Sequence, residues 1–134
     1  MIVATDAPLL AHELDRLARR AVHGLSKTGS VSGNSSGDIA LAFSTGNPIA
    51  RDAFWKGDGY ALGSIEQFDI QPLFEAAAEA VEEAVINALF MATDMDGVDG
   101  HRVYALPIPR TLDIMRAHGR LFAPAAESRA NVTA

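Results

Sequence analysis

A run of glycine and small polar residues, Gly29 to Asp38, is the segment of this 134-residue chain whose side chains could do chemistry. Ser36 stands two residues before Asp38 and directly ahead of an apolar strand pattern. A hydroxyl and a carboxylate at this spacing can form a short hydrogen-bonded chain that orients a catalytic group. Exposed turns also favour Asn, Ser and Gly for local geometry alone. Two interpretations stay open: a site, or a solvent-exposed turn.

Within this loop the candidate residues have their own alternatives. Asn34 is a candidate substrate contact, but the turn interpretation is favoured for it. The carboxylate of Asp38 could equally be satisfied by amide groups of the loop.

Other kinds of site find little support in the sequence. The chain has no cysteine, which excludes disulfides, thiolate metal sites and a cysteine nucleophile. The glycine loop lacks the endings of phosphate-binding motifs, and the acidic stretch from Asp94 to His101 departs from a calcium-binding loop at Val98. The four histidines form no pair at i,i+4 spacing. The sequence therefore implies no metal and no cofactor.

Charge and hydropathy limit the partners. Eleven Lys and Arg against seventeen Asp and Glu give a net charge of −6, so we expect no nucleic-acid partner. No stretch reaches the roughly 18 to 20 uninterrupted apolar residues that cross a bilayer, because glutamates at 79, 82 and 83 break the nearest run. We expect no membrane partner and a cytoplasmic location.

Hydrophobic spacing predicts the elements that must position the loop. Strands are expected over Ile2–Thr5, Asp38–Thr45 and Arg102–Leu106, and helices after an N-cap at Asp6, from about Asp69 to Thr93, and from about Pro109 to His118. In the first helix an apolar stripe begins at Leu10 and Leu14, and its polar residues are expected on the other faces. These polar residues are Glu13, Asp15, Arg16, Arg19, Arg20 and His23.

The predicted fold class is mixed α/β, but its strands are too few. Three short strands cannot cover two long one-sided helices, and residues 46–67 would form a long loop without structure of its own. We therefore expect another chain or further sequence to complete the core. Residues 1–122 are expected to form one portion of a single domain, and residues 123–134 a flexible tail.

Several blocks of the sequence, taken in order, strongly resemble the DmpA-type aminopeptidases, the L-aminopeptidase/D-esterase or β-peptidyl aminopeptidase family. The blocks cover nearly the whole chain and correspond to the family's β-chain, the C-terminal product of self-cleavage. They are Val3–Leu10, Leu17–Ala21, Gly33–Thr45, Pro72–Ala76, Glu82–Leu89 and Asp99–His101.

The resemblance implies part of an αββα sandwich in which a serine, exposed by self-cleavage, attacks small peptides, amides or esters. An α-amine has an unperturbed pKa near 8, so it can act as the base for the hydroxyl of its own residue. The nucleophile is expected a couple of residues before Met1 and the α-chain outside this sequence. By the same resemblance, Ser36 matches a serine that bonds to the nucleophile, and Asp38 an acidic residue that supports it.

Two functions follow from this resemblance. The first is the C-terminal part of a self-processing serine aminopeptidase, inactive as an isolated chain and partnered by the α-chain of the same precursor. Such a protein is expected to assemble as a homo-oligomer of αβ units and to bind a small peptide or amide substrate. The alternative is a non-catalytic homologue that acts as an oligomerising or interaction subunit.

Overall fold

The computed structural model describes residues 1–57 and 59–121. The described residues form two compact units, one from Met1 to Ala88 and one that begins at Leu89. The tail expected over residues 123–134 lies outside the described residues.

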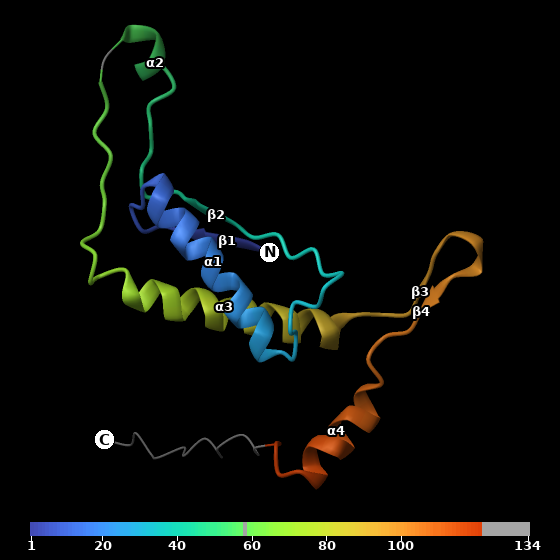
Figure 1. Ribbon diagram of the computed structural model, residues 1–134. Coiled ribbons are helices and arrows are strands. Elements are labelled where there is room, and N and C mark those ends of the chain that lie inside the picture. The colour runs from blue at the N-terminus through green and yellow to red at the C-terminus, as the bar shows by residue number, and fades with distance from the viewer. Residues whose placement is uncertain (58, 122–134) are drawn as a thin grey trace, which may run out of the picture. The chain divides into compact units, whose positions relative to one another are not determined.

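The first unit is organised around a pair of parallel strands, β1 (Ile2–Thr5) and β2 (Leu41–Ser44), as Figure 1 shows. The register places Ile2 opposite Leu41 and Val3 opposite Ala42. Val3 and Ala42 pack against the buried core, whereas Ile2 and Leu41 are exposed on the other face. Side chains alternate between the two faces of a strand, so one face of this pair meets the helices and the other stays bare.

Helix α1 (Ala11–Lys27) lies between the two strands in the sequence and begins later than the pattern predicted. The expected N-cap at Asp6 is wrong: residue 10 caps the helix, and the Glu13 carboxylate accepts a hydrogen bond of 2.7 Å from the Leu10 backbone N–H. The intervening residues form a turn instead, in which the Ala7 N–H donates to the Thr5 hydroxyl at 3.1 Å. At the start of the helix itself, the Glu13 carboxylate satisfies the Leu10 N–H, one of the backbone N–H groups that a helix start leaves unpaired.

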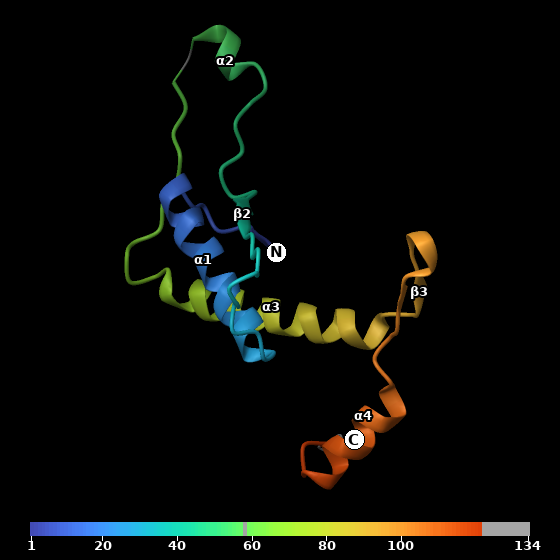
Figure 2. The same cartoon turned by 45° about the vertical axis from the view of Figure 1, so that its right-hand side comes forward.

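Helix α3 (Gln71–Met91) packs against α1, and the two views in Figures 1 and 2 show both helices beside the strands. The core between these elements is small and apolar; it contains Leu9, Leu17, Ile70, Phe74 and Ala77, all buried. Gly24 lies at the contact with α3, where a Cβ atom would stand 2.3 Å from the Ala78 carbonyl oxygen. The glycine therefore permits a close approach of the two helix backbones.

The long segment between β2 and α3 contains one helical turn, α2 (Ala53–Lys56), where the sequence predicted no structure. Asn47 joins the two ends of the long segment. Its side-chain amide donates to the Gly63 carbonyl at 3.0 Å and accepts from the Gly63 N–H at 2.7 Å. The same amide donates to the Leu9 carbonyl at 3.3 Å. A single side chain thus anchors the base of the loop to the start of α1.

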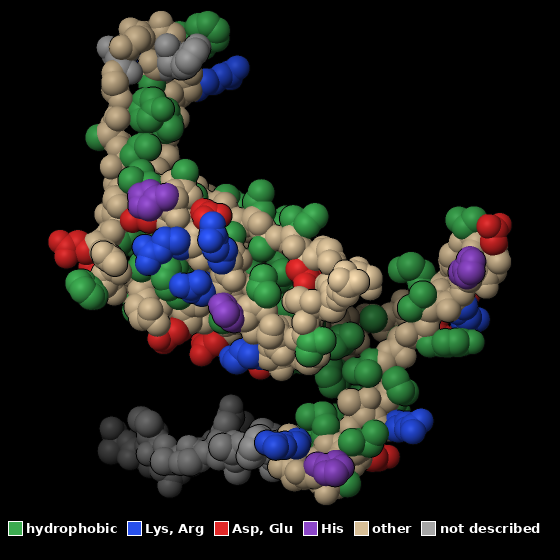
Figure 3. Space-filling model, viewed as in Figure 1, with side chains coloured by type: hydrophobic (Ala, Val, Ile, Leu, Met, Phe, Trp, Pro, Cys, Tyr) green, Lys and Arg blue, Asp and Glu red, His purple; other side chains and the backbone are tan. Residues whose placement is uncertain are grey.

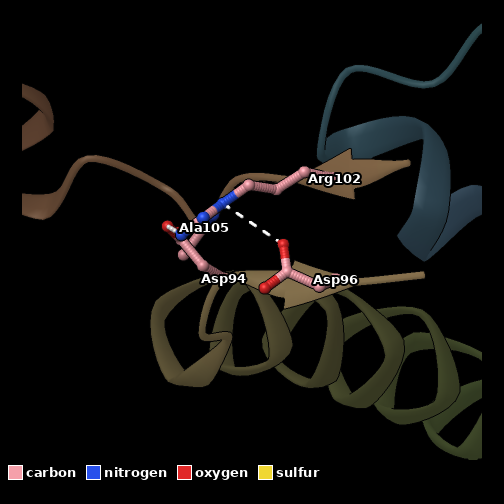
Figure 4. Close-up of polar contacts among 4 residues, drawn as sticks. All are labelled: Asp94, Asp96, Arg102 and Ala105. Atoms are coloured by element: carbon pink, nitrogen blue, oxygen red, sulfur yellow. Dashed lines mark hydrogen bonds and ion pairs between the residues drawn. The ribbon is translucent and has the colours of Figure 1, made fainter. Parts of the chain in front are cut away.

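The second unit contains a short hairpin and a helix. Strands β3 (Met95–Asp96) and β4 (Arg102–Val103) are antiparallel and are joined by a 3₁₀ turn, Val98–Gly100, before helix α4 (Ile108–Ala117). Asp94 holds the hairpin base, since its carboxylate accepts from Arg102 Nη2 at 3.0 Å and from the Ala105 N–H at 2.9 Å (Figure 4). Both hydrogen bonds lower the pKa of Asp94, and the one from the Ala105 backbone has the larger effect. The stretch from Asp94 to His101 is therefore part of a hairpin, with the 3₁₀ turn between its two strands.

Candidate active site

The candidate site lies at the edge of the parallel pair where both strands begin. The Leu41 N–H donates to the Met1 carbonyl at 3.0 Å, and the Met1 backbone nitrogen donates to the Ile39 carbonyl at 2.6 Å. Because β1 and β2 run in the same direction, the residues that precede each strand meet at this one edge. The glycine-rich loop between α1 and β2 therefore ends beside the start of β1, as Figures 1 and 2 both show.

Ser36 and Asp38 form the hydrogen-bonded pair that their spacing suggested. The Ser36 hydroxyl donates to Asp38 Oδ2 at 2.9 Å, and the Ser36 N–H donates to the Gly33 carbonyl at 2.8 Å. Both side chains are exposed. The serine donates its one proton to the carboxylate, so the lone pairs of its oxygen stay available to accept a hydrogen bond from a further group.

Asn34 lies in the turn that precedes this pair, and its side chain is exposed. Among residues 1–57 and 59–121 the Asn34 amide makes no side-chain hydrogen bond. The loop thus brings Ser36 and Asp38 together and leaves Asn34 apart from them, while the roles of all three in binding or catalysis stay predictions.

One recess of the first unit lies away from this pair, and a second recess is lined by Ala40, Leu41 and Ala42, which follow Asp38 in the sequence. The first recess, of about 150 Å³, is lined by residues of β1, α1 and α3, among them Val3, Leu17 and Ala77. Its lining is apolar and carries no titratable side chain, so it offers packing space rather than a place for acid or base chemistry. In the described part of the chain no three His, Cys, Asp or Glu side chains gather as metal ligands.

Glu13 is the buried polar residue that the sequence pattern misplaced. The apolar stripe of the helix predicted an outer face for Glu13, but only 4% of the residue is exposed. Its second carboxylate oxygen accepts a hydrogen bond from the Ser64 hydroxyl at 2.8 Å. The hydrogen bond from the Leu10 N–H is the largest influence on the pKa of Glu13 and lowers it. Burial opposes this effect, and the Ser64 hydroxyl and the charges of His12 and Arg16 lower the pKa further. A glutamate at the third helical position is the signal that could have indicated it.

Comparison with known proteins gives consistent matches over most of the chain. The model of peptidase family S58 matches residues 1–103. A beta-peptidyl aminopeptidase of Sphingosinicella microcystinivorans, BapA, is 37% identical over 123 residues, which cover 92% of this chain and 31% of that protein.

Two solved structures show the same fold. A protein of Pyrococcus horikoshii OT3 is 50% identical with a TM-score of 0.81, over 90% of this chain and 33% of the other. The L-aminopeptidase D-Ala-esterase/amidase of Ochrobactrum anthropi, described as a variant of the Ntn hydrolase fold, is 36% identical with a TM-score of 0.77, over 90% of this chain and 34% of the other. The chain thus spans about a third of the length of these relatives. No helix in the described residues has the length and apolar character to cross a bilayer.

Proposed function

The chain belongs to peptidase family S58, and from that membership we propose that it is the C-terminal part of a self-processing serine aminopeptidase. The resemblance to the DmpA-type aminopeptidases is confirmed, and the mixed α/β fold is part of the αββα sandwich of that group. The proposed reaction is the removal of N-terminal residues from small peptides, amides or esters.

The observation that carries this proposal is the Ser36–Asp38 hydrogen bond at the edge where β1 begins. The family resemblance places the nucleophilic serine just ahead of the strand that corresponds to β1. A serine there would lie at the same edge as Ser36, whose hydroxyl oxygen can accept a hydrogen bond from the hydroxyl or the α-amine of that residue. Ser36 is therefore proposed to orient the nucleophile, with Asp38 fixing the direction of the Ser36 proton.

The bare face of the strand pair supports the second part of the proposal, that an α-chain completes the fold. Ile2, Leu41 and Phe43 lie on this face and are 73%, 54% and 44% exposed. Apolar patches of this kind mark surfaces that another element covers. We propose that the α-chain of the same precursor packs there, that such αβ units form a homo-oligomer, and that the isolated chain is inactive because the nucleophile lies outside it.

The test compares two neighbouring serines in the protein that carries this chain together with its α-chain. Hydrolysis of alanine p-nitroanilide is measured for S36A and for the matched control S35A, whose side chain makes no hydrogen bond within the described residues. Loss of a group that positions a proton donor or acceptor costs a factor of about 100 or more, so S36A should lose most of its kcat while S35A keeps it.

Equal activity of S36A and the unchanged protein would refute the role of Ser36. An assembled protein without any hydrolysis, but with a stable oligomeric mass, would instead support a non-catalytic interaction subunit.

A further inference from the structure

Four of the basic side chains of helix α1 lie along one face. They are His12, Arg16, Arg20 and His23, which follow each other at steps of four, four and three and so lie on one side of the helix over about three turns. Figure 3 shows the blue and purple side chains gathered on the face of the first unit that it displays. On a chain with a net charge of −6, Arg16 and Arg20 place two positive charges close together on this face.

Arg16 and Arg20 share one aromatic ring. Their guanidinium carbons lie 5.1 and 4.3 Å from the centre of the Phe74 ring. The ring belongs to α3 and is buried, with 6% exposed, while both arginines are half-buried. Stacking on an aromatic face holds a guanidinium group in place and leaves the N–H groups at its rim for other partners.

The neighbouring cations Arg19 and Lys27 form ion pairs, whereas Arg16 and Arg20 form none within the described residues. Arg19 pairs with Asp15 at 2.6 Å, and Lys27 pairs with Glu82 at 2.5 Å. Within residues 1–57 and 59–121, neither Arg16 nor Arg20 has a carboxylate at ion-pair distance. Glu13 acts on Arg16 through its charge alone, since its two oxygens accept from Leu10 and Ser64.

Two like charges held over one ring repel each other, and an anion that contacts both relieves the repulsion. A phosphate group suits this arrangement because it presents several oxygens and a double negative charge to two guanidinium forks. We infer that Arg16 and Arg20, stacked on Phe74, form a binding site for a phosphate group. The group would come from inorganic phosphate or from a phosphorylated small molecule.

Calorimetric titration of the purified protein, with any polypeptide that co-purifies, tests this inference at low ionic strength. Inorganic phosphate and phosphoserine are the two probes, and acetate is the carboxylate comparison. We expect saturable phosphate binding that weakens at least tenfold in R16Q and in R20Q. R19Q, which removes a charge from the same helix but leaves the pair on Phe74 intact, should bind as the unchanged protein does.

Phosphoserine separates the two sources of the group. Binding of phosphate with exclusion of phosphoserine assigns the site to the free ion, and equal binding of both assigns it to phosphorylated small molecules. R16K and R20K keep the charge but lose the planar fork, so they should lose part of the affinity and also show that the site survives conservative replacement.

Three results would overturn the inference. These are the absence of saturable phosphate binding, an equal loss of affinity in R19Q and R16Q, and a changed oligomeric mass of R16Q without phosphate binding by the unchanged protein. The last result would assign the face to contact with another polypeptide. Aminopeptidase activity is measured independently, so failure of this site would leave the proposed function untouched.

Discussion

Replacing Gly24 with alanine tests whether the close approach of α1 and α3 holds the first unit together. A Cβ atom at Gly24 would lie 2.3 Å from the Ala78 carbonyl oxygen and 2.8 Å from Val81 Cβ. The carbonyl belongs to the backbone of α3 and cannot rotate away, so the two helices must move apart and loosen the packing around Phe74.

Two effects of opposite sign decide the result. Alanine favours a helix interior over glycine by about 1 kcal/mol. Overpacking costs about 1–3 kcal/mol, and the upper end applies here because the obstructing atom is backbone. We therefore expect the G24A variant to lose about 2 kcal/mol of unfolding free energy, the difference between these terms.

Urea unfolding followed by circular dichroism measures this loss in the purified protein. The matched control is G33A, because a Cβ atom at Gly33 meets nothing within 4 Å and the change should stay within about 0.5 kcal/mol. A G24A protein as stable as the unchanged one would refute the close contact between the helix backbones.

Two further predictions concern carboxylates with lowered pKa values. The ionised carboxylate of Glu13 stabilises the fold above its unfolded-state pKa, and this contribution is lost as the pH falls through the lower folded-state pKa. The E13Q variant lacks this contribution, so below about pH 4.5 it should lose less unfolding free energy than the unchanged protein does. Equal pH dependence in acid unfolding curves would contradict this. For Asp94, the D94N variant should expose the Ala105 N–H to faster hydrogen exchange, whereas D96N should not, because Asp96 holds Arg102 only at 3.6 Å and does not contact Ala105. Exchange at Ala105 that is unchanged in D94N would show that the carboxylate does not hold the hairpin base.

The local patterns of the sequence predict where the main elements lie, and long-range contacts decide their limits. The apolar residues of β1 and the stripe of α1 lie where their periodicity placed them. The strand expected over Asp38–Thr45 is confirmed only for Leu41–Ser44, because β1 offers four partner positions and the residues before Leu41 belong to the loop. The strand expected over Arg102–Leu106 likewise shortens to two residues.

The local spacing of residues likewise predicts part of the candidate site, whereas its long-range contacts do not follow from spacing. Ser36 and Asp38 are two residues apart, so their hydrogen bond is a local event that spacing can predict. The burial of Glu13 depends on Ser64, a residue from a distant loop that helical periodicity does not describe. The pairing of Arg16 and Arg20 over Phe74 likewise requires the contact of two helices.

The parallel register of β1 and β2 also affects how the chain is made. Ile2 pairs with Leu41, so all of α1 is synthesised between the two partners. At about 5–20 residues per second, β1 waits for a few seconds on the ribosome before β2 emerges. Helix α1 is the first element to follow it, so early docking of Leu14 and Leu17 shields this strand in the nascent chain.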